Sequence, residues 1–143
     1  MPTYQDPTLV FYVEESQFDS IDVSGNTKTK DYVILREIDI KTGDKVNEVE
    51  LKKNLGRVFN LNYFSEVVPD LMPSLATKNA YDLLINVKEK STDSINVGGG
   101  WGQQNGGFLY SDLNINNFLG TGQLIALRGQ WGGRVQTYQF KYF

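Results

Sequence analysis

The stretch SINVGGGWGQQNGGFLYSDLNINNFLGTGQLIALRGQWGGRVQTYQFKYF (Ser94–Phe143) decides the fold of this chain. It holds eleven of the fourteen glycines and nine of the eighteen aromatic residues, but only four charged side chains. Turn signals divide it into four segments of about ten residues, which are Ser94–Gln104, Gly107–Asn116, Gln123–Trp131 and Val135–Phe143. Because Asn-Gly and Gly-Gly pairs readily adopt the positive φ of tight hairpins, the sequence predicts four antiparallel strands.

Apolar and polar residues alternate within these segments. Successive side chains of a strand point to opposite faces, so the alternation predicts one apolar and one polar face. The apolar face comprises Ile95, Val97, Trp101, Leu109, Leu113, Ile115, Ile125, Leu127, Trp131, Tyr138, Phe140 and Tyr142. The charged side chains Asp112, Arg128 and Lys141 fall on the polar face, which is otherwise rich in Asn, Gln, Thr and Gly.

Two environments produce such a sheet. A soluble sheet has one face on a core and the other in water, where Lys and Glu are common. A transmembrane β-barrel has one face in lipid and the other in a wet lumen, and its strands are roughly 9–11 residues long. The scarcity of charge on the polar face favours the barrel.

The residue content excludes several classes of function. The chain has no Cys and no His, which removes disulfides, Ser-His-Asp and Cys-His catalytic groups, and the Cys/His ligand sets of zinc sites. The glycine run after Val97 contains no G-x-G-x-x-G, and Gly102 and Gly107 have Walker spacing but are followed by Phe108 where a phosphate-binding loop needs lysine. The net charge is −3, and basic residues are too few for nucleic acid. We therefore expect no enzyme activity, no catalytic residues, no cofactor and no metal.

Upstream of Ser94 the pattern predicts an α+β unit in the order β-α-α-β-β, with a three-stranded mixed sheet and two helices on one side. Its expected elements are a strand Gln17–Ser24, a helix Lys30–Glu37 capped by Thr29, a second helix capped by Asn47, a strand Phe64–Val68 and a strand Tyr81–Glu89.

The second helix and the strand after it carry further signals. Leu51, Leu55, Val58 and Leu61 recur at helical intervals and form one apolar stripe, in which Gly56 would allow a close approach to the sheet. The strand Phe64–Val68 is followed by Pro69 and Pro73, which lack N–H donors, so it should lie at a sheet edge.

An internal similarity indicates tandem units. Leu9–Val23, which includes a predicted strand Leu9–Glu15, aligns with Leu83–Val97 at an offset of 74 residues. Fixed-period similarity marks repeats, so the chain should begin on the last strand of a preceding unit.

Several motifs resemble a known family. The segments Val23–Asn26, Arg36–Asp44, Asn60–Val67 and Leu84–Glu89 resemble a POTRA (polypeptide-transport-associated) domain, and Ser94–Gly100, Gly106–Phe108 and Asn114–Gln123 resemble the opening strands of the barrel that follows the last POTRA domain. The family is that of the outer-membrane assembly and translocation proteins.

The resemblance implies a domain division and a task. Residues 1–16 would be the tail of a preceding POTRA domain, 17–92 a POTRA domain, and 93–143 the first four antiparallel strands of a truncated transmembrane β-barrel. The POTRA part would face the periplasm or its plastid equivalent, and the barrel would lie in outer-membrane lipid. The implied partners are unfolded outer-membrane polypeptides, neighbouring POTRA domains and accessory assembly subunits.

Two sites follow as hypotheses, since an edge strand can accept an added strand through its free backbone groups. The first is the edge formed by Phe64, Ser65, Glu66, Val67 and Val68, where a client strand would pair. The second is a barrel seam at Ile95, Val97, Gly98, Gly99, Gly100, Trp101 and Gly102. Glycine weakens a strand, so this seam could open to a client, and replacing Gly98–Gly100 with Val should lock it. Alternatively, these glycines only relieve crowding at a curved corner of the barrel.

Other interpretations remain open. Within the family, the chain could belong to a two-partner secretion pore for a single exported protein. Outside it, the chain could be a soluble β-rich adaptor that binds peptides. Because four strands cannot close a barrel, we expect the sequence to be a fragment of a longer protein.

Overall fold

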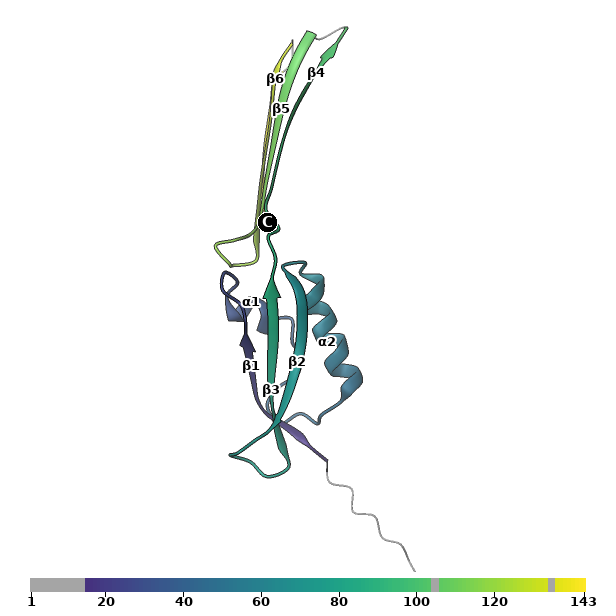
Figure 1. Cartoon of the computed structure of the whole chain (residues 1–143), viewed down its shortest axis with the longest axis vertical. Helices are drawn as coiled ribbons and strands as arrows, with labels where there is room; N and C mark the ends of the chain where they lie inside the picture. Colours follow the sequence, from purple (N-terminus) through teal and green to yellow (C-terminus); the bar gives the residue numbers. More distant parts are fainter. Residues whose placement is uncertain (1–14, 104–105, 134–135) are drawn as a thin grey trace, which may run out of the picture.

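The computed structural model describes residues 15–103, 106–133 and 136–143, which form two β-sheets placed end to end (Figure 1). The three-stranded sheet has the order β1-β3-β2 and the four-stranded sheet the order β4-β5-β6-β7. The elements are β1 (Gln17–Ser24), α1 (Asp31–Leu35), α2 (Glu48–Asn60), β2 (Phe64–Pro73), β3 (Ala80–Glu89), β4 (Ser94–Gly102), β5 (Gly106–Phe118), β6 (Gln123–Gly132) and β7 (Thr137–Tyr142).

The three-stranded sheet confirms the predicted β-α-α-β-β order. Strand β1 runs parallel to β3 and β2 runs antiparallel to it, so the sheet is mixed. Its apolar face packs under the two helices, as Figure 1 shows for α1 and α2. The core consists of Phe18, Ile34, Ile40, Leu51, Val58, Phe64, Leu83, Ile85 and Val87.

Helix α2 begins as its sequence predicts. The Asn47 side chain accepts hydrogen bonds from the backbone N–H of Val49 at 3.0 Å and of Glu50 at 3.4 Å. These bonds satisfy N–H groups that have no partner inside the helix. The expectation for Gly56 was wrong, because a Cβ at that position would meet no atom within 4 Å. Its helix face is open space and not a contact with the sheet.

Helix α1 differs from the prediction at both ends. It spans Asp31–Leu35, and its N-cap is Lys30, whose side chain makes no capping hydrogen bond. Thr29 is therefore not the cap. Its side-chain Oγ1 instead accepts a hydrogen bond from Nδ2 of Asn117, 88 residues away, and this long-range contact could not be seen in the local pattern.

The four-stranded sheet is an open antiparallel meander in the described residues, with each strand bonded to the next in sequence. Strand β5 extends past the predicted end at Asn116 to Phe118, and the register shifts between Ile115 and Phe118 where Asn117 adopts a φ of 55°. Most of the predicted strand Leu9–Glu15 lies outside the described residues, as does Asn105 of the first predicted turn.

Neither helix of the described residues combines the length and the apolar character that a transmembrane helix requires.

Candidate functional site

The apolar residues of β4–β7 form continuous rows across the sheet. Directly opposed residues of antiparallel strands share a face, so the register defines each row. One row runs Ile95, Leu113, Leu127, Phe140, and the row beside it runs Ile115, Ile125, Tyr142. All twelve residues assigned to the apolar face from the sequence lie on this face. Nothing in the described residues covers it, and Phe140 is 67% exposed.

Aromatic rings gather at the end of this face away from the three-stranded sheet. Trp131 and Tyr138 meet edge to face with ring centroids 6.0 Å apart. The Trp131 ring lies over Gly129, where an added Cβ would come within 2.5 Å of it. Trp101 of β4 is also exposed. An exposed apolar face of this extent marks a contact with lipid or with another protein.

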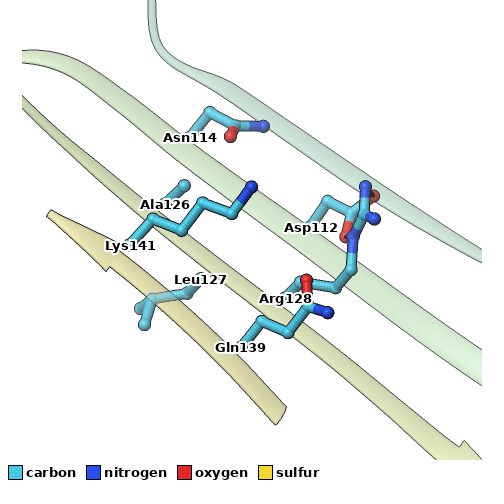
Figure 2. Close-up of a pocket in the computed structure, with 7 residues that line it drawn as sticks. All are labelled: Asp112, Asn114, Ala126, Leu127, Arg128, Gln139 and Lys141. Carbon is cyan, nitrogen blue, oxygen red and sulfur yellow. Dashed lines mark hydrogen bonds and ion pairs between the residues drawn. The ribbon is translucent and has the colours of Figure 1, made fainter. Parts of the chain in front are cut away.

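The opposite face carries a small polar cluster (Figure 2). Asp112 and Arg128 face each other across β5 and β6, and the guanidinium donates to both carboxylate oxygens, from Nε at 2.6 Å and from Nη2 at 3.2 Å. Asn114, Gln139 and Lys141 line the same shallow hollow of about 100 Å³. The sequence correctly placed the three charges on one face. This face therefore carries an ion pair and a lysine among polar amides.

The glycines of β4 make room for side chains of β5. A Cβ at Gly98 would lie 2.5 Å from the Tyr110 ring, and a Cβ at Gly100 would lie 2.9 Å from the Phe108 ring. Gly102 differs, because its nearest neighbour would be a backbone oxygen at 4.0 Å. A side chain at Gly98 or Gly100 would therefore meet an aromatic ring of β5, and valine at these positions would clash before it tested any seam.

Strand β2 lies at the edge of its sheet, as the prolines predicted. The N–H of Ser74 bonds the carbonyl of Ala80 at 2.9 Å, so alternate residues from Ser74 back along β2 bond inward to β3. Val67, Pro69 and Pro73 then point their backbone groups to the free edge. Pro69 and Pro73 have no backbone N–H, so the edge lacks hydrogen-bond donors at these two positions. Regular addition of a strand is therefore confined to the stretch before Pro69.

The residues of this stretch differ in what they expose. Phe64 is fully buried in the core and Val67 is half-buried, whereas Ser65, Glu66 and Val68 are exposed. A strand added here would pair with the backbone and would meet Glu66 and Val68 on the face away from the helices.

The sequence did not predict that the two sheets contact each other at a junction. The turn that joins β5 to β6 contacts the loop before α1 through Asn117 and Thr29, and that loop is bound by Glu89 at the end of β3. The only available signal was the Asn-x-x-Gly-x-Gly pattern after Asn116, which indicated a turn but not its distant partner.

No group of three or more His, Cys, Asp or Glu side chains that could hold a metal ion occurs within residues 15–103, 106–133 and 136–143.

A family model described as "POTRA: Surface antigen variable number repeat" matches residues 16–90. The chain belongs to the POTRA family. This match covers all three strands of the first sheet and both helices, so the resemblance of this part of the chain to a POTRA domain is confirmed.

The relatives of this POTRA protein carry the names of assembly factors. Over 135 residues, 90% of this chain, it is 35% identical to a protein of Treponema pallidum described as a candidate outer membrane protein assembly factor. Over 123 residues, 86% of the chain, it is 32% identical to the outer membrane protein assembly factor BamA of Neisseria meningitidis serogroup B. The chain covers only 16% and 15% of these two relatives.

A solved structure shares the fold of both sheets. BamA from Haemophilus ducreyi lacking POTRA domains 1–3 superimposes with a TM-score of 0.77 and 24% identity, over 89% of this chain and 24% of that chain. The names of the two curated relatives both describe the assembly of outer-membrane proteins.

Proposed function

We propose that this chain joins a POTRA domain, residues 17–92, to the first barrel strands, residues 93–143, of an outer-membrane pore that receives unfolded polypeptides and inserts or translocates them. The observation that carries the proposal is the uncovered apolar face that crosses all four strands of the second sheet directly after the POTRA sheet. The names of the relatives support the same assignment.

The apolar face is the proposed lipid contact. Fully burying an exposed Val, Leu, Ile or Phe side chain is worth about 1.5–3 kcal/mol, and eight of the twelve residues of this face are of these types, so the face strongly favours an apolar surrounding. The polar face, with Asp112, Arg128 and Lys141, would line the lumen. In the proposed arrangement the POTRA sheet would lie on the periplasmic side of the membrane.

The free edge of β2 is the proposed site where an incoming polypeptide pairs as an added strand. Its outward backbone groups precede Pro69, and the exposed Glu66 and Val68 would contact alternate side chains of the client. Backbone pairing is tolerant of sequence, which suits a protein that handles many unfolded clients.

A second proposed pairing site is the outer edge of β4, which carries the glycines of the predicted seam. Gly102→Val tests this site without a clash, because among the glycines of β4 it is Gly102 that has room for a side chain. We expect Gly102→Val to strengthen strand pairing at the seam and to slow client insertion.

The main experiment reconstitutes the natural protein in vesicles of outer-membrane lipid and supplies an unfolded porin-type client. Insertion is measured as the fraction of client that becomes folded and protease-resistant. Val67→Pro removes the outward N–H of β2, and Val67→Ala is the matched control that shortens the side chain but keeps the donor. We expect Val67→Pro to lower insertion clearly below Val67→Ala. Equal insertion by both variants would exclude pairing at this edge, and no insertion by the unmodified protein would contradict the proposed function.

A further inference from the structure

The turn between β5 and β6 is seated on the POTRA domain (Figure 1). The backbone N–H of Lys30 donates to the carbonyl of Gly120 at 2.9 Å, and Nδ2 of Asn117 donates to Oγ1 of Thr29 at 2.7 Å. Asn117 and Thr29 are each only 3% exposed. The fit is close, because a Cβ at Gly120 would lie 1.7 Å from the carbonyl oxygen of Lys28.

Asn117 holds both sides of this contact. Its backbone adopts a φ of 55°, a left-handed conformation that asparagine tolerates better than most residues. While Nδ2 reaches Thr29, Oδ1 accepts the N–H of Gly122 at 2.8 Å. The carbonyl of Gly122 in turn accepts the hydroxyl of Tyr63 at 3.1 Å. One buried amide therefore shapes the turn and ties it to the POTRA domain.

The receiving loop is itself fixed to the POTRA sheet. The Glu89 carboxylate accepts hydrogen bonds from the backbone N–H groups of Thr27, Lys28 and Thr29 at 3.1, 2.9 and 2.6 Å, and from the Thr27 hydroxyl at 2.6 Å. Because Glu89 is the last residue of β3, these bonds connect the central strand of the sheet to the loop that Asn117 contacts.

The covalent link between the sheets gives little control of their orientation. Residues 90–93 join β3 to β4, and short exposed linkers leave relative motion of domains as the default. Asp93 of this linker accepts the N–H of Asn116 at 3.0 Å, beside the seated turn. The linker and the turn together attach the two sheets at two points. Two attachment points resist a rotation of one sheet relative to the other that a single point would permit.

We propose that Asn117, acting with Thr29 and Gly120, is a positioning residue that fixes the direction of the POTRA sheet relative to the four-stranded sheet. This inference rests on the proposed function, since the orientation would determine where a client bound at β2 meets the edge of β4. Asn117 acts through the junction and does not contact the client.

The test measures the orientation directly. The chain contains no cysteine, so Lys53→Cys on α2 and Gln139→Cys on β7 introduce two defined sites for spin labels. Distances are measured by pulsed electron paramagnetic resonance on the natural protein in lipid vesicles, with any other thiols removed. Asn117→Gly keeps the left-handed backbone but removes the amide, and Thr29→Val keeps the shape but removes the acceptor. We expect either change to widen the distance distribution about twofold, since a released junction samples more orientations.

Leu119→Asn is the matched control. Leu119 lies in the same turn, has a φ of 52° and is exposed, so asparagine should fit without touching the junction. We expect it to leave the distances unchanged. Unchanged distances in both Asn117→Gly and Thr29→Val would overturn the proposal.

Client insertion is measured on the same vesicles, and it separates the positioning role of Asn117 from the proposed function of the protein. Wider distances with slower insertion would support the positioning role. Wider distances with unaltered insertion would overturn the claim that this orientation determines where a client bound at β2 meets the edge of β4. If the unmodified protein inserts no client, the proposed function fails, while the distances still decide whether Asn117 sets the orientation.

Discussion

The two sheets of this protein share one pattern of alternating apolar residues and have opposite surroundings. In the POTRA sheet, Leu83 is 1% exposed because two helices cover it. In the four-stranded sheet, Phe140 is 67% exposed because nothing in the described residues lies over it. Alternation therefore states which side chains share a face and leaves open what covers that face.

The difference shows in the residues on the opposite faces. The outward side of the POTRA sheet carries charged residues such as Asp22, Asp82 and Lys88, which prefer bulk water. The polar side of the four-stranded sheet carries amides such as Asn114 and Gln139, the ion pair of Asp112 with Arg128, and Lys141. The composition of the polar face is therefore a better guide to the environment than the apolar face itself.

The largest difference between the two sheets should appear when Phe64→Ala in the POTRA sheet is compared with Phe140→Ala in the four-stranded sheet. Phe64 is fully buried, and its truncation should cost about 3–5 kcal/mol through lost burial and a residual cavity. Phe140→Ala should change stability in water by less than about 0.5 kcal/mol, as for other exposed positions. Equilibrium urea unfolding followed by circular dichroism measures both. Similar losses for the two variants would mean that Phe140 has a protein partner in solution.

A charge on each face of β7 tests the proposed lipid contact. Phe140→Arg should destabilise the membrane-inserted protein by about 2–4 kcal/mol if the residue lies near the bilayer midplane. Gln139→Arg, on the opposite face of the same strand, is the control and should cost far less. Urea titration in lipid vesicles gives the two values. Equal costs would place both faces in water.

The Glu89 carboxylate and the N–H groups of Thr27, Lys28 and Thr29 that it binds form a contact that we call the Glu89 clamp. This clamp makes the stability of the POTRA domain depend on pH. Burial by itself would raise the pKa of Glu89, but hydrogen bonds from Thr27, Lys28 and Thr29 outweigh it and lower the pKa to about 2. Because this pKa lies below the ordinary value of 4.5, the ionised clamp stabilises the fold above pH 4.5 and loses its effect as the pH falls toward 2.

Glu89→Gln removes the charge and keeps the shape. We expect a loss of about 1.5 kcal/mol at pH 7, at the lower end for bonds to a charged group because the site is partly exposed to solvent. The loss should shrink as the pH is lowered from 4.5 toward 2, which urea unfolding at several pH values would detect. A loss independent of pH would argue against an ionised clamp.

The smallest expected effect is at Gly56. Since a Cβ at this position meets open space, Gly56→Ala should stabilise α2 by about 0.5–1 kcal/mol through helix propensity alone. Thermal unfolding of the POTRA domain measures it. A destabilised variant would reveal a partner of this helix face that the chain alone does not contain.

Much of the fold could be predicted because its signals are local. The cap at Asn47 and the prolines after Val68 act within a few residues, so the start of α2 and the edge position of β2 were predicted correctly. The faces of β4–β7 followed from strict alternation. Two predictions were wrong. Thr29 does not cap α1 because its side chain binds a partner 88 residues away, and Gly56 does not approach the sheet because the packing around it is not stated by the sequence.

The sequence alone determined the order of strands and helices, the two faces of each sheet and the absence of thiol and imidazole chemistry, since these depend on residue type and on spacing along the chain. Only the tertiary structure decided that Tyr110 and Phe108 occupy the space above the β4 glycines, and that Asn117 joins the two sheets. Such contacts form between residues that are far apart in the sequence. The spacing of residues along the chain does not state which of them come within hydrogen-bonding or van der Waals distance after folding.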